Sequence, residues 1–121
     1  MNNQNIFFLG CGKMGKIIAN NLIKNNIYSA KNLLILKPSN TNKIDGLNYI
    51  DSLDKIPHNY KANIVFICIK PQNSAKILEQ FISAKIFDSN TIFISILAGK
   101  NIEFFTNFFG KSAKIARAMP N

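Results

Sequence analysis

Residues 6–15 read Ile6-Phe7-Phe8-Leu9-Gly10-Cys11-Gly12-Lys13-Met14-Gly15 and are the most informative part of the chain. Four apolar residues lead into a G-x-G-x-x-G pattern, after which Met14, Ile17, Ile18 and Leu22 recur at the spacing of an amphipathic helix. This order predicts a strand, a tight turn and a helix, with glycines that let the backbone approach a phosphate and let the helix lie close to the strand. Free N–H groups at the start of such a helix attract an anion. We therefore predict the pyrophosphate site of a dinucleotide-binding domain; the alternative is that the glycines serve the turn alone.

Short apolar runs alternate with segments of helical spacing through the rest of the chain. Beyond residues 6–9, the sequence predicts strands over residues 33–36, 47–50, 64–69, 91–97 and 113–116, and helices around residues 78–86 and 102–109. Strands that are apolar on both faces and are separated by helices are typical of a parallel sheet covered on both sides. We predict an α/β fold, with a doubly wound, mainly parallel sheet and helices on both faces (Rossmann-like). The length of 121 residues fits a single domain.

Composition excludes several classes of protein. The chain is 47% hydrophobic and 17% charged, which is not the composition of a disordered or low-complexity segment. Its longest apolar run, residues 64–69, is far shorter than the roughly 20 residues of a membrane-spanning helix. The polar start of the chain lacks the basic region of a signal peptide. We expect a cytoplasmic protein without a membrane partner. The two cysteines, Cys11 and Cys68, make no disulfide framework and no C-x-x-C motif, so we expect free, buried thiols.

The net charge of +9 favours an anionic partner, although it does not identify one. Fourteen of the fifteen cations are lysine, a bias that A/T-rich codons alone would produce. Clustered phenylalanines in residues 104–109 suggest a nucleic-acid-binding surface as one alternative. Their spacings of three and four are those of an ordinary packed helix, and the chain has a single arginine, so we expect no nucleic-acid partner.

The segment after the second predicted strand indicates which dinucleotide binds. An NAD-binding domain carries Asp or Glu about 20 residues past the glycines, where the carboxylate accepts hydrogen bonds from the ribose. Here the first acidic residue of the chain is Asp45, and six lysines precede it. Lys37 and Ser39 follow the strand and provide a cation and a hydroxyl suited to a 2′-phosphate. The sequence therefore predicts NADP as the cofactor; the alternative is a basic surface loop.

Four more motifs follow the glycine-rich stretch in order. They are Lys37-Pro38-Ser39, Phe66-Ile67-Cys68-Ile69-Lys70-Pro71-Gln72, Ile94-Ser95-Ile96-Leu97-Ala98-Gly99 and Arg117-Ala118-Met119-Pro120-Asn121. Together the five resemble the ordered signatures of the pyrroline-5-carboxylate reductase family, and the resemblance spans the whole chain. The 6-phosphogluconate and hydroxyisobutyrate dehydrogenases and the F420-dependent NADP reductases share the first motif but fit the later ones less well.

The resemblance implies hydride transfer from NADPH to the C=N carbon of 1-pyrroline-5-carboxylate, giving L-proline. It places residues 9–14 around the pyrophosphate, Ser39 at the 2′-phosphate, residues 68–71 along the ribose and nicotinamide, and residues 96–98 facing the nicotinamide ring. The predicted cofactor-binding residues are therefore Leu9, Gly10, Cys11, Gly12, Lys13, Met14, Ser39, Cys68, Ile69, Lys70, Pro71, Ile96, Leu97 and Ala98. We predict no catalytic residue and no metal site, because the chain offers neither paired carboxylates nor a Cys-His or Ser-His-Asp set.

Three departures from the family pattern qualify this prediction. Lys13 stands where Asn is common, and Leu97 replaces a small residue beside the nicotinamide, where it is expected to crowd the ring. The third is length: residues 1–116 are predicted to form the dinucleotide-binding domain, and residues 117–121 to begin a segment that leads to a helical domain absent from this chain. We expect a cofactor-binding domain that is inactive alone and has a helical partner domain or chain. A shortened chain, half of a split gene, a degraded remnant and a stand-alone NADP(H)-sensing module all fit the sequence.

Overall fold

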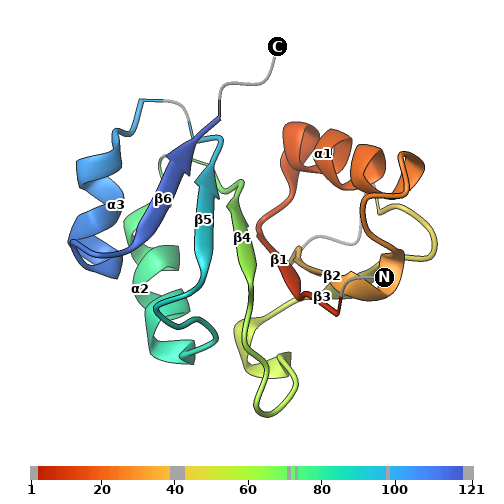
Figure 1. Cartoon of the computed structure of the whole chain (residues 1–121), viewed down its shortest axis with the longest axis horizontal. Coiled ribbons are helices and arrows are strands. Elements are labelled where there is room, and N and C mark those ends of the chain that lie inside the picture. The colour runs from red at the N-terminus through yellow and green to blue at the C-terminus, as the bar shows by residue number, and fades with distance from the viewer. Residues whose placement is uncertain (1–2, 39–42, 71, 73, 98, 119–121) are drawn as a thin grey trace.

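Strands and helices alternate along most of the chain (Figure 1). The computed structural model describes residues 3–38, 43–70, 72, 74–97 and 99–118. The strands are β1 (Ile6–Leu9), β2 (Leu33–Leu36), β3 (Asn48–Ile50), β4 (Ile64–Ile67), β5 (Ile92–Ser95) and β6 (Lys114–Arg117). The helices are α1 (Gly12–Lys24), α2 (Ser74–Ala84) and α3 (Ile102–Phe109), with 3₁₀ turns at Ala30–Asn32 and Leu53–Lys55.

The described strands form one sheet in the order β3-β2-β1-β4-β5-β6, and every neighbouring pair is parallel. The chain builds outward from β1 to β3 in one direction and from β4 to β6 in the other. Leu9, the last residue of β1, lies opposite Leu36 on one side and Ile67 on the other. This reversal of direction creates a crevice outside the carboxyl ends of the central strands. The predicted doubly wound α/β fold is confirmed.

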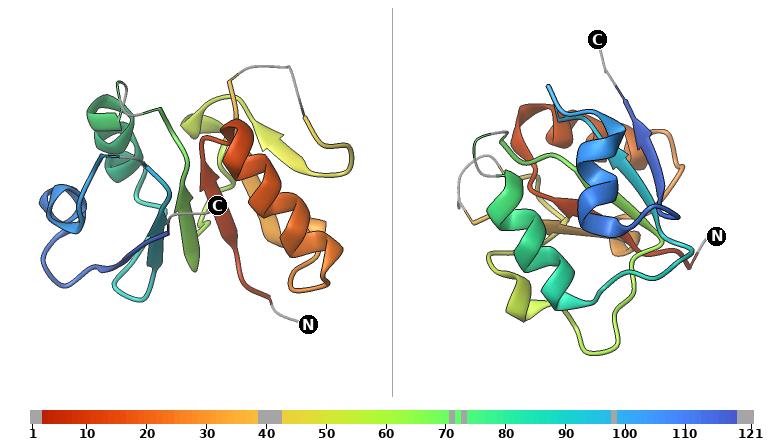
Figure 2. Two further views of the ribbon diagram at one scale, coloured as in Figure 1. Left: turned by 90° about the horizontal axis from the view of Figure 1, so that it is seen from above. Right: turned by 90° about the vertical axis from the view of Figure 1, so that its left-hand side faces the viewer.

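The central strand β1 is buried on both faces, because helices cover both sides of the sheet (Figure 2). Phe7 and Leu9 belong to a core cluster that includes residues of α2 and α3, whereas Ile6 and Phe8 belong to a second cluster that includes Ala19 of α1. Alternate residues of a strand point to opposite faces, so one apolar run supplies both clusters. The continuous apolar pattern of residues 6–9 follows directly from this double burial.

Helix α1 lies on the sheet by a face that overlaps the predicted apolar stripe but excludes Ile17. Gly15 and Ala19 are its buried residues, with Ile18 partly buried beside them, whereas Ile17 is 47% exposed. Small side chains let a helix axis approach the sheet more closely than an isoleucine would allow. The contact face is therefore centred on Gly15 and Ala19 and includes Ile18 and Leu22 of the predicted stripe, whereas the prediction for Ile17 is wrong.

Helix α3 is packed against the sheet by its phenylalanines. Phe105 is fully buried, and the ring of Phe109 stacks on that of Phe93 in β5 with 4.0 Å between centroids. Asn101 caps the helix, because its Oδ1 accepts a hydrogen bond of 2.9 Å from the backbone N–H of Phe104. The aromatic spacing in this segment is that of a core-facing helix.

Candidate dinucleotide-binding site

The glycine-rich loop joins β1 to α1 at the carboxyl edge of the sheet, next to the crevice. The backbone φ of Gly10 is +82° and that of Gly12 is +51°, a region that residues with a Cβ rarely adopt. A Cβ added at Gly10 would lie 2.9 Å from Cγ2 of Ile69, which is too close for any real contact. The end of β4 therefore lies directly beneath the loop, and the first glycine is required by the protein itself.

The third glycine brings α1 down onto the same strand end. A Cβ at Gly15 would lie 3.2 Å from Sγ of Cys68 and 3.7 Å from Sγ of Cys11. The N–H of Cys68 donates a 3.0 Å hydrogen bond to the carbonyl of Leu9, which continues the ladder between β4 and β1 for one more step. Gly15 thus allows close contact between helix and strand, as the motif predicts.

Gly12 differs from Gly10 and Gly15, because a Cβ there would meet only the Cys68 carbonyl oxygen, at 3.8 Å. Its Cα faces a cavity of about 270 Å³ at the carboxyl edge of the sheet. The cavity is lined by Cys11, Gly12, Lys13, Met14, Gly15, Cys68, Ile69, Lys70, Ile96 and Leu97. Most of the predicted cofactor-binding residues therefore lie around one cavity, although they come from the ends of three different strands.

The remaining predicted residues fall into two groups. Leu9 is fully buried at the end of β1, and Gly10 lies against Ile69 underneath the loop, so both support the cavity from below. Ser39, Pro71 and Ala98 lie outside the described residues.

Leu97 lines the cavity but belongs largely to the protein core. Its side chain is 5% exposed and is part of the core cluster on the α2 and α3 side of the sheet. The buried hydroxyl of Ser95 accepts a 3.1 Å hydrogen bond from the Leu97 N–H, which fixes the bend after β5. Since most of the leucine side chain is held in the core, its effect on a ring in the cavity is smaller than its size alone suggests.

A second cavity, of about 390 Å³, adjoins the loop on the β2 side and is lined by Gly12, Lys13, Lys16 and Lys37. Gly12 lines both cavities, so they meet at the loop. Lys37 follows β2, and its N–H donates a 2.8 Å hydrogen bond to the carbonyl of Ile50 at the end of β3. Lys16 belongs to the basic stretch before Asp45 but is not among the residues that the sequence predicts for the site. Its spacing of one helical turn from Lys13 was the available signal.

Both thiols of the site are held in the neutral form. Burial raises the pKa of Cys11, and the nearby charges of Lys37 and Lys16 offset part of that rise. Burial also raises the pKa of Cys68 to about 12. Both cysteines are free, as predicted; Cys11 is buried and Cys68 is partly exposed. A neutral thiol at neutral pH is a poor nucleophile, so these groups shape the site and do not supply covalent chemistry.

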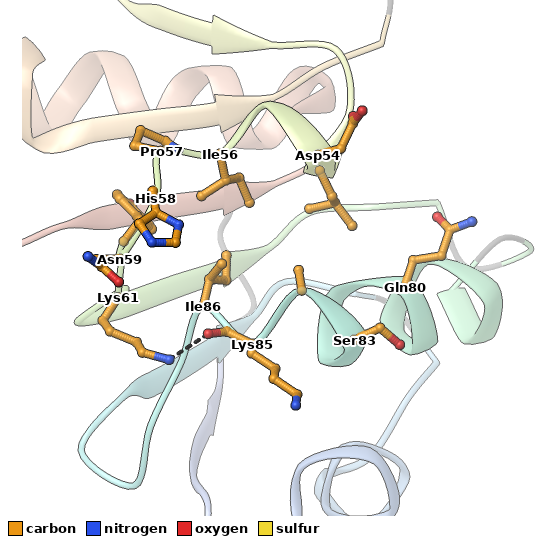
Figure 3. Close-up of a pocket in the computed structure, with 13 residues that line it drawn as sticks. Asp54, Ile56, Pro57, His58, Asn59, Lys61, Gln80, Ser83, Lys85 and Ile86 are labelled. Carbon is orange, nitrogen blue, oxygen red and sulfur yellow. Dashed lines mark hydrogen bonds between the residues drawn. The ribbon is translucent and has the colours of Figure 1, made fainter.

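The largest of the described cavities, about 540 Å³, lies at the other edge of the sheet (Figure 3). It is formed by the loop before β4 and the end of α2, where Lys61 Nζ donates a 2.6 Å hydrogen bond to the Lys85 carbonyl. The charged ends of Asp54 and Lys85 point away from each other in this view. Ligands of open α/β sheets bind at the carboxyl ends of strands, and this cavity is at the amino ends. The smaller cavities at the glycine loop are therefore the candidate site.

The described residues contain neither a metal-binding cluster nor a helix that could span a membrane. No three His, Cys, Asp or Glu side chains among them are grouped so that they could hold a metal ion. Within the same part of the chain, no helix is long and apolar enough to cross a membrane.

Comparison with known proteins agrees with the motifs. The sequence profile of a family described as NADP oxidoreductase, coenzyme F420-dependent, matches residues 5–99. Pyrroline-5-carboxylate reductase of Escherichia coli K12 is 30% identical to this chain, and the match covers 98% of this chain and 44% of the relative. Pyrroline-5-carboxylate reductase 2 of Bacillus subtilis is 26% identical, and the match covers 98% of this chain and 43% of the relative. The chain therefore spans less than half the length of these relatives.

Solved structures give the same result. The crystal structure of Plasmodium falciparum pyrroline carboxylate reductase with NADP bound superposes with a TM-score of 0.80, at 30% identity over 100% of this chain and 44% of that one. Prephenate dehydrogenase of A. aeolicus, at 15% identity and a TM-score of 0.70 over 93% of this chain and 41% of its own, shares the fold alone. The chain belongs to the NADP oxidoreductase, coenzyme F420-dependent, family, and its predicted resemblance to the pyrroline-5-carboxylate reductases is confirmed.

Proposed function

We propose that this chain is the NADP(H)-binding part of a reductase that transfers hydride from NADPH to the C=N carbon of 1-pyrroline-5-carboxylate. The observation that carries the proposal is the cavity lined by Gly12, Lys13, Lys16 and Lys37, which adjoins the glycine loop and contains no acidic side chain. The solved P. falciparum relative is a pyrroline carboxylate reductase with NADP bound.

The loop and the start of α1 fit a pyrophosphate. The space above Gly12 is open, and an added Cβ would project into it. The first turn of α1 has no acidic residue, so its free N–H groups and the positive end of the helix dipole are available to an anion. We assign the pyrophosphate to residues 10–14 on this basis.

The lysine-lined cavity fits the additional phosphate that distinguishes NADP from NAD. Lys16 and Lys37 come from α1 and from the end of β2, and the cavity brings them together. A phosphate held by two charge-assisted contacts of about 1.5–3 kcal/mol each would be preferred over a hydroxyl by on the order of a hundredfold or more. Ser39 remains a predicted third contact.

The other cavity fits the nicotinamide end. Cys68, Ile69, Ile96 and Leu97 give it an apolar wall, and Lys70 adds a cation at its margin. NADPH, when bound, supplies the hydride; the residues of this chain bind the cofactor, orient it and shield one side from water. Pro71 and Ala98 remain predicted contacts. Positioning of this kind is the main contribution that a protein makes to hydride transfer from a nicotinamide.

A reductase also has to hold the imino acid against the cofactor. Because the chain spans less than half of its curated relatives, we propose that a helical domain or partner chain carries that part of the site. A stand-alone NADP(H)-sensing module is the alternative, and it differs from the first proposal in whether a partner restores turnover.

Titration calorimetry with NADPH and NADH tests the cofactor proposal. We expect NADPH to bind on the order of a hundredfold more tightly, and Lys16→Gln and Lys37→Gln each to weaken NADPH binding about tenfold while changing NADH binding little. Lys111→Gln is the matched control, because Lys111 is exposed in the turn after α3 and lines neither cavity. Equal affinities for the two cofactors, or an equal loss in the Lys111 variant, would contradict the assignment of the 2′-phosphate.

Turnover measurements distinguish part of a reductase from a stand-alone NADP(H)-sensing module. NADPH oxidation with 1-pyrroline-5-carboxylate is followed for the chain alone and after adding the helical portion of the E. coli relative. We expect negligible turnover alone, because loss of substrate confinement removes several powers of ten in rate. Recovery in the mixture supports a reductase half; no recovery, with NADPH binding intact, supports the sensing module. Rapid turnover by the chain alone would show that it also holds the substrate.

A further inference from the structure

A further cleft at the carboxyl edge of the sheet lies between the start of α3 and the end of β6, the edge strand. Its volume is about 440 Å³, and it is lined by Gly99, Lys100, Asn101, Phe104 and Arg117. Two of these five residues are cations and none is acidic. Within the described part of the chain, neither cation forms an ion pair. The cleft is therefore positively charged and has no neutralising group of its own.

Lys100 is half-buried and held by an aromatic ring. Its Nζ lies 4.6 Å from the centroid of the Phe104 ring, within the range of a cation–π contact. The Asn101 cap fixes the first turn of α3, whose positive end adds to the charge of the cleft. Glu103, the acidic residue of that turn, is exposed and does not line the cleft.

Arg117 has a specific chemical capacity that the lysines of this chain lack. It is the only arginine in a sequence with fourteen lysines. Its backbone is fixed opposite Ser95 in β5, and the N–H of the next residue, Ala118, donates a 2.8 Å hydrogen bond to the Ser95 carbonyl. A guanidinium can donate two parallel hydrogen bonds to the two oxygens of a carboxylate, whereas an ammonium acts as a point charge. The single planar donor at this position favours an anion that presents two oxygens, such as a carboxylate.

The cleft is close to the proposed nicotinamide site. Leu97 lines the cavity at the glycine loop and Gly99 lines the cleft, and two residues of chain span at most about 7 Å. A small molecule held in the cleft would therefore lie near the reactive end of a cofactor bound at the loop.

We propose that the cleft between Lys100 and Arg117 binds the carboxylate of a small organic acid. Its role beside the cofactor rests on the proposed function, whereas the binding of a carboxylate does not. Arg117 supplies the bidentate contact, and Lys100, positioned by Phe104, supplies the second positive charge. The chain thus carries one subsite for the acid, in addition to whatever a helical partner contributes.

NMR titration of the ¹⁵N-labelled chain with NADP⁺ present tests the proposal. The probes are cyclopentanecarboxylate and cyclopentanecarboxamide, which share a ring and differ in charge. We expect saturable shifts of the Gly99, Lys100 and Ala118 amide signals with the carboxylate only. Arg117→Gln is expected to weaken carboxylate binding about tenfold or more. Arg117→Lys keeps the charge but loses the two parallel N–H donors of the guanidinium, and it is expected to weaken binding severalfold.

Lys114→Gln, on the same strand and outside the cleft, is the matched control and should bind the carboxylate as the parent does. The spectra report whether each variant is folded. Equal shifts with the carboxamide, non-saturable shifts, or an equal loss in the Lys114 variant would overturn the proposal. A separate titration of the labelled chain with NADP⁺ alone separates the two hypotheses: normal cofactor binding without carboxylate binding refutes the subsite alone, and carboxylate binding without cofactor binding refutes the proposed function alone.

Discussion

Gly12→Ala is expected to abolish tight NADPH binding while leaving the fold intact. A Cβ at this position meets no protein atom closer than 3.8 Å, so the substitution adds no steric overlap within the protein. Its cost to the fold is the left-handed backbone, at φ +51°, which is about 1–2 kcal/mol for a residue with a Cβ. The added methyl group projects into the cavity where we place the pyrophosphate, and we expect at least a tenfold loss of affinity.

Gly46→Ala is the matched control for the backbone effect. Gly46 has a φ of +89° and no atom within 4 Å of an added Cβ, and it lines none of the described cavities at the carboxyl edge. The two variants should therefore lose similar stability, about 5 °C of Tm per kcal/mol for a chain of this size, and differ in cofactor binding. Gly10→Ala should destabilise the fold more than either, because its Cβ would overlap Ile69.

Thermal unfolding and NADPH titration of the three variants measure the effects on stability and on cofactor binding separately. The expected order of Tm is parent, then Gly12→Ala and Gly46→Ala together, then Gly10→Ala. If Gly12→Ala binds NADPH within about twofold of Gly46→Ala, the cofactor does not lie beside Gly12 and the placement of the pyrophosphate is wrong.

Three further substitutions test the packing and the thiols. Phe81→Ala removes a fully buried ring that contacts several other phenylalanines, and should cost about 3–5 kcal/mol of unfolding free energy in a denaturant titration. Thr91→Val removes the buried hydroxyl that donates to the Ala62 carbonyl at 2.7 Å and accepts from the Asp88 N–H; a loss of about 1–3 kcal/mol is expected, and Thr91→Ser should retain most of the stability. Because burial raises the pKa of Cys68 from 9.0 to about 12, the unfolded chain loses that proton first, so stability should fall as pH rises above about 9; Cys68→Ala should flatten this dependence of Tm on pH.

Much of the fold follows from the apolar runs. Residues 33–36 and 102–109 form the strand and helix predicted, because each is bounded by residues that end the element. The run at residues 64–69 extends two residues beyond β4, which ends at Ile67. Cys68 and Ile69 are apolar for a different reason: they support the glycine loop from below. Sequence pattern cannot separate residues that pair in a sheet from residues that pack beneath a loop.

The cavities could be anticipated only in part. The glycine spacing predicted the loop, but the meeting of Lys16 with Lys37 depends on how α1 crosses the sheet relative to β2. That crossing is set by the close approach at Gly15 and Ala19, which hydrophobicity does not reveal, because both residues are small and contribute little to an apolar stripe. The contact of Lys100 with Phe104 likewise depends on the cap at the start of α3.

The structure gives a separate reason for glycine at each of the three positions of the motif. Gly10 and Gly15 both lie against the residues that follow β4: a Cβ at Gly10 would overlap Ile69, and a Cβ at Gly15 would make a tight contact with Cys68. A Cβ at Gly12 would meet no protein atom closer than 3.8 Å, and Gly12 lines both cavities beside the loop. If the loop served the fold alone, the middle position would need only a residue that adopts a positive φ, and Asn does so at little cost. The open space above Gly12 together with the lysine-lined cavity beside it is therefore the part of the motif that argues for a bound dinucleotide.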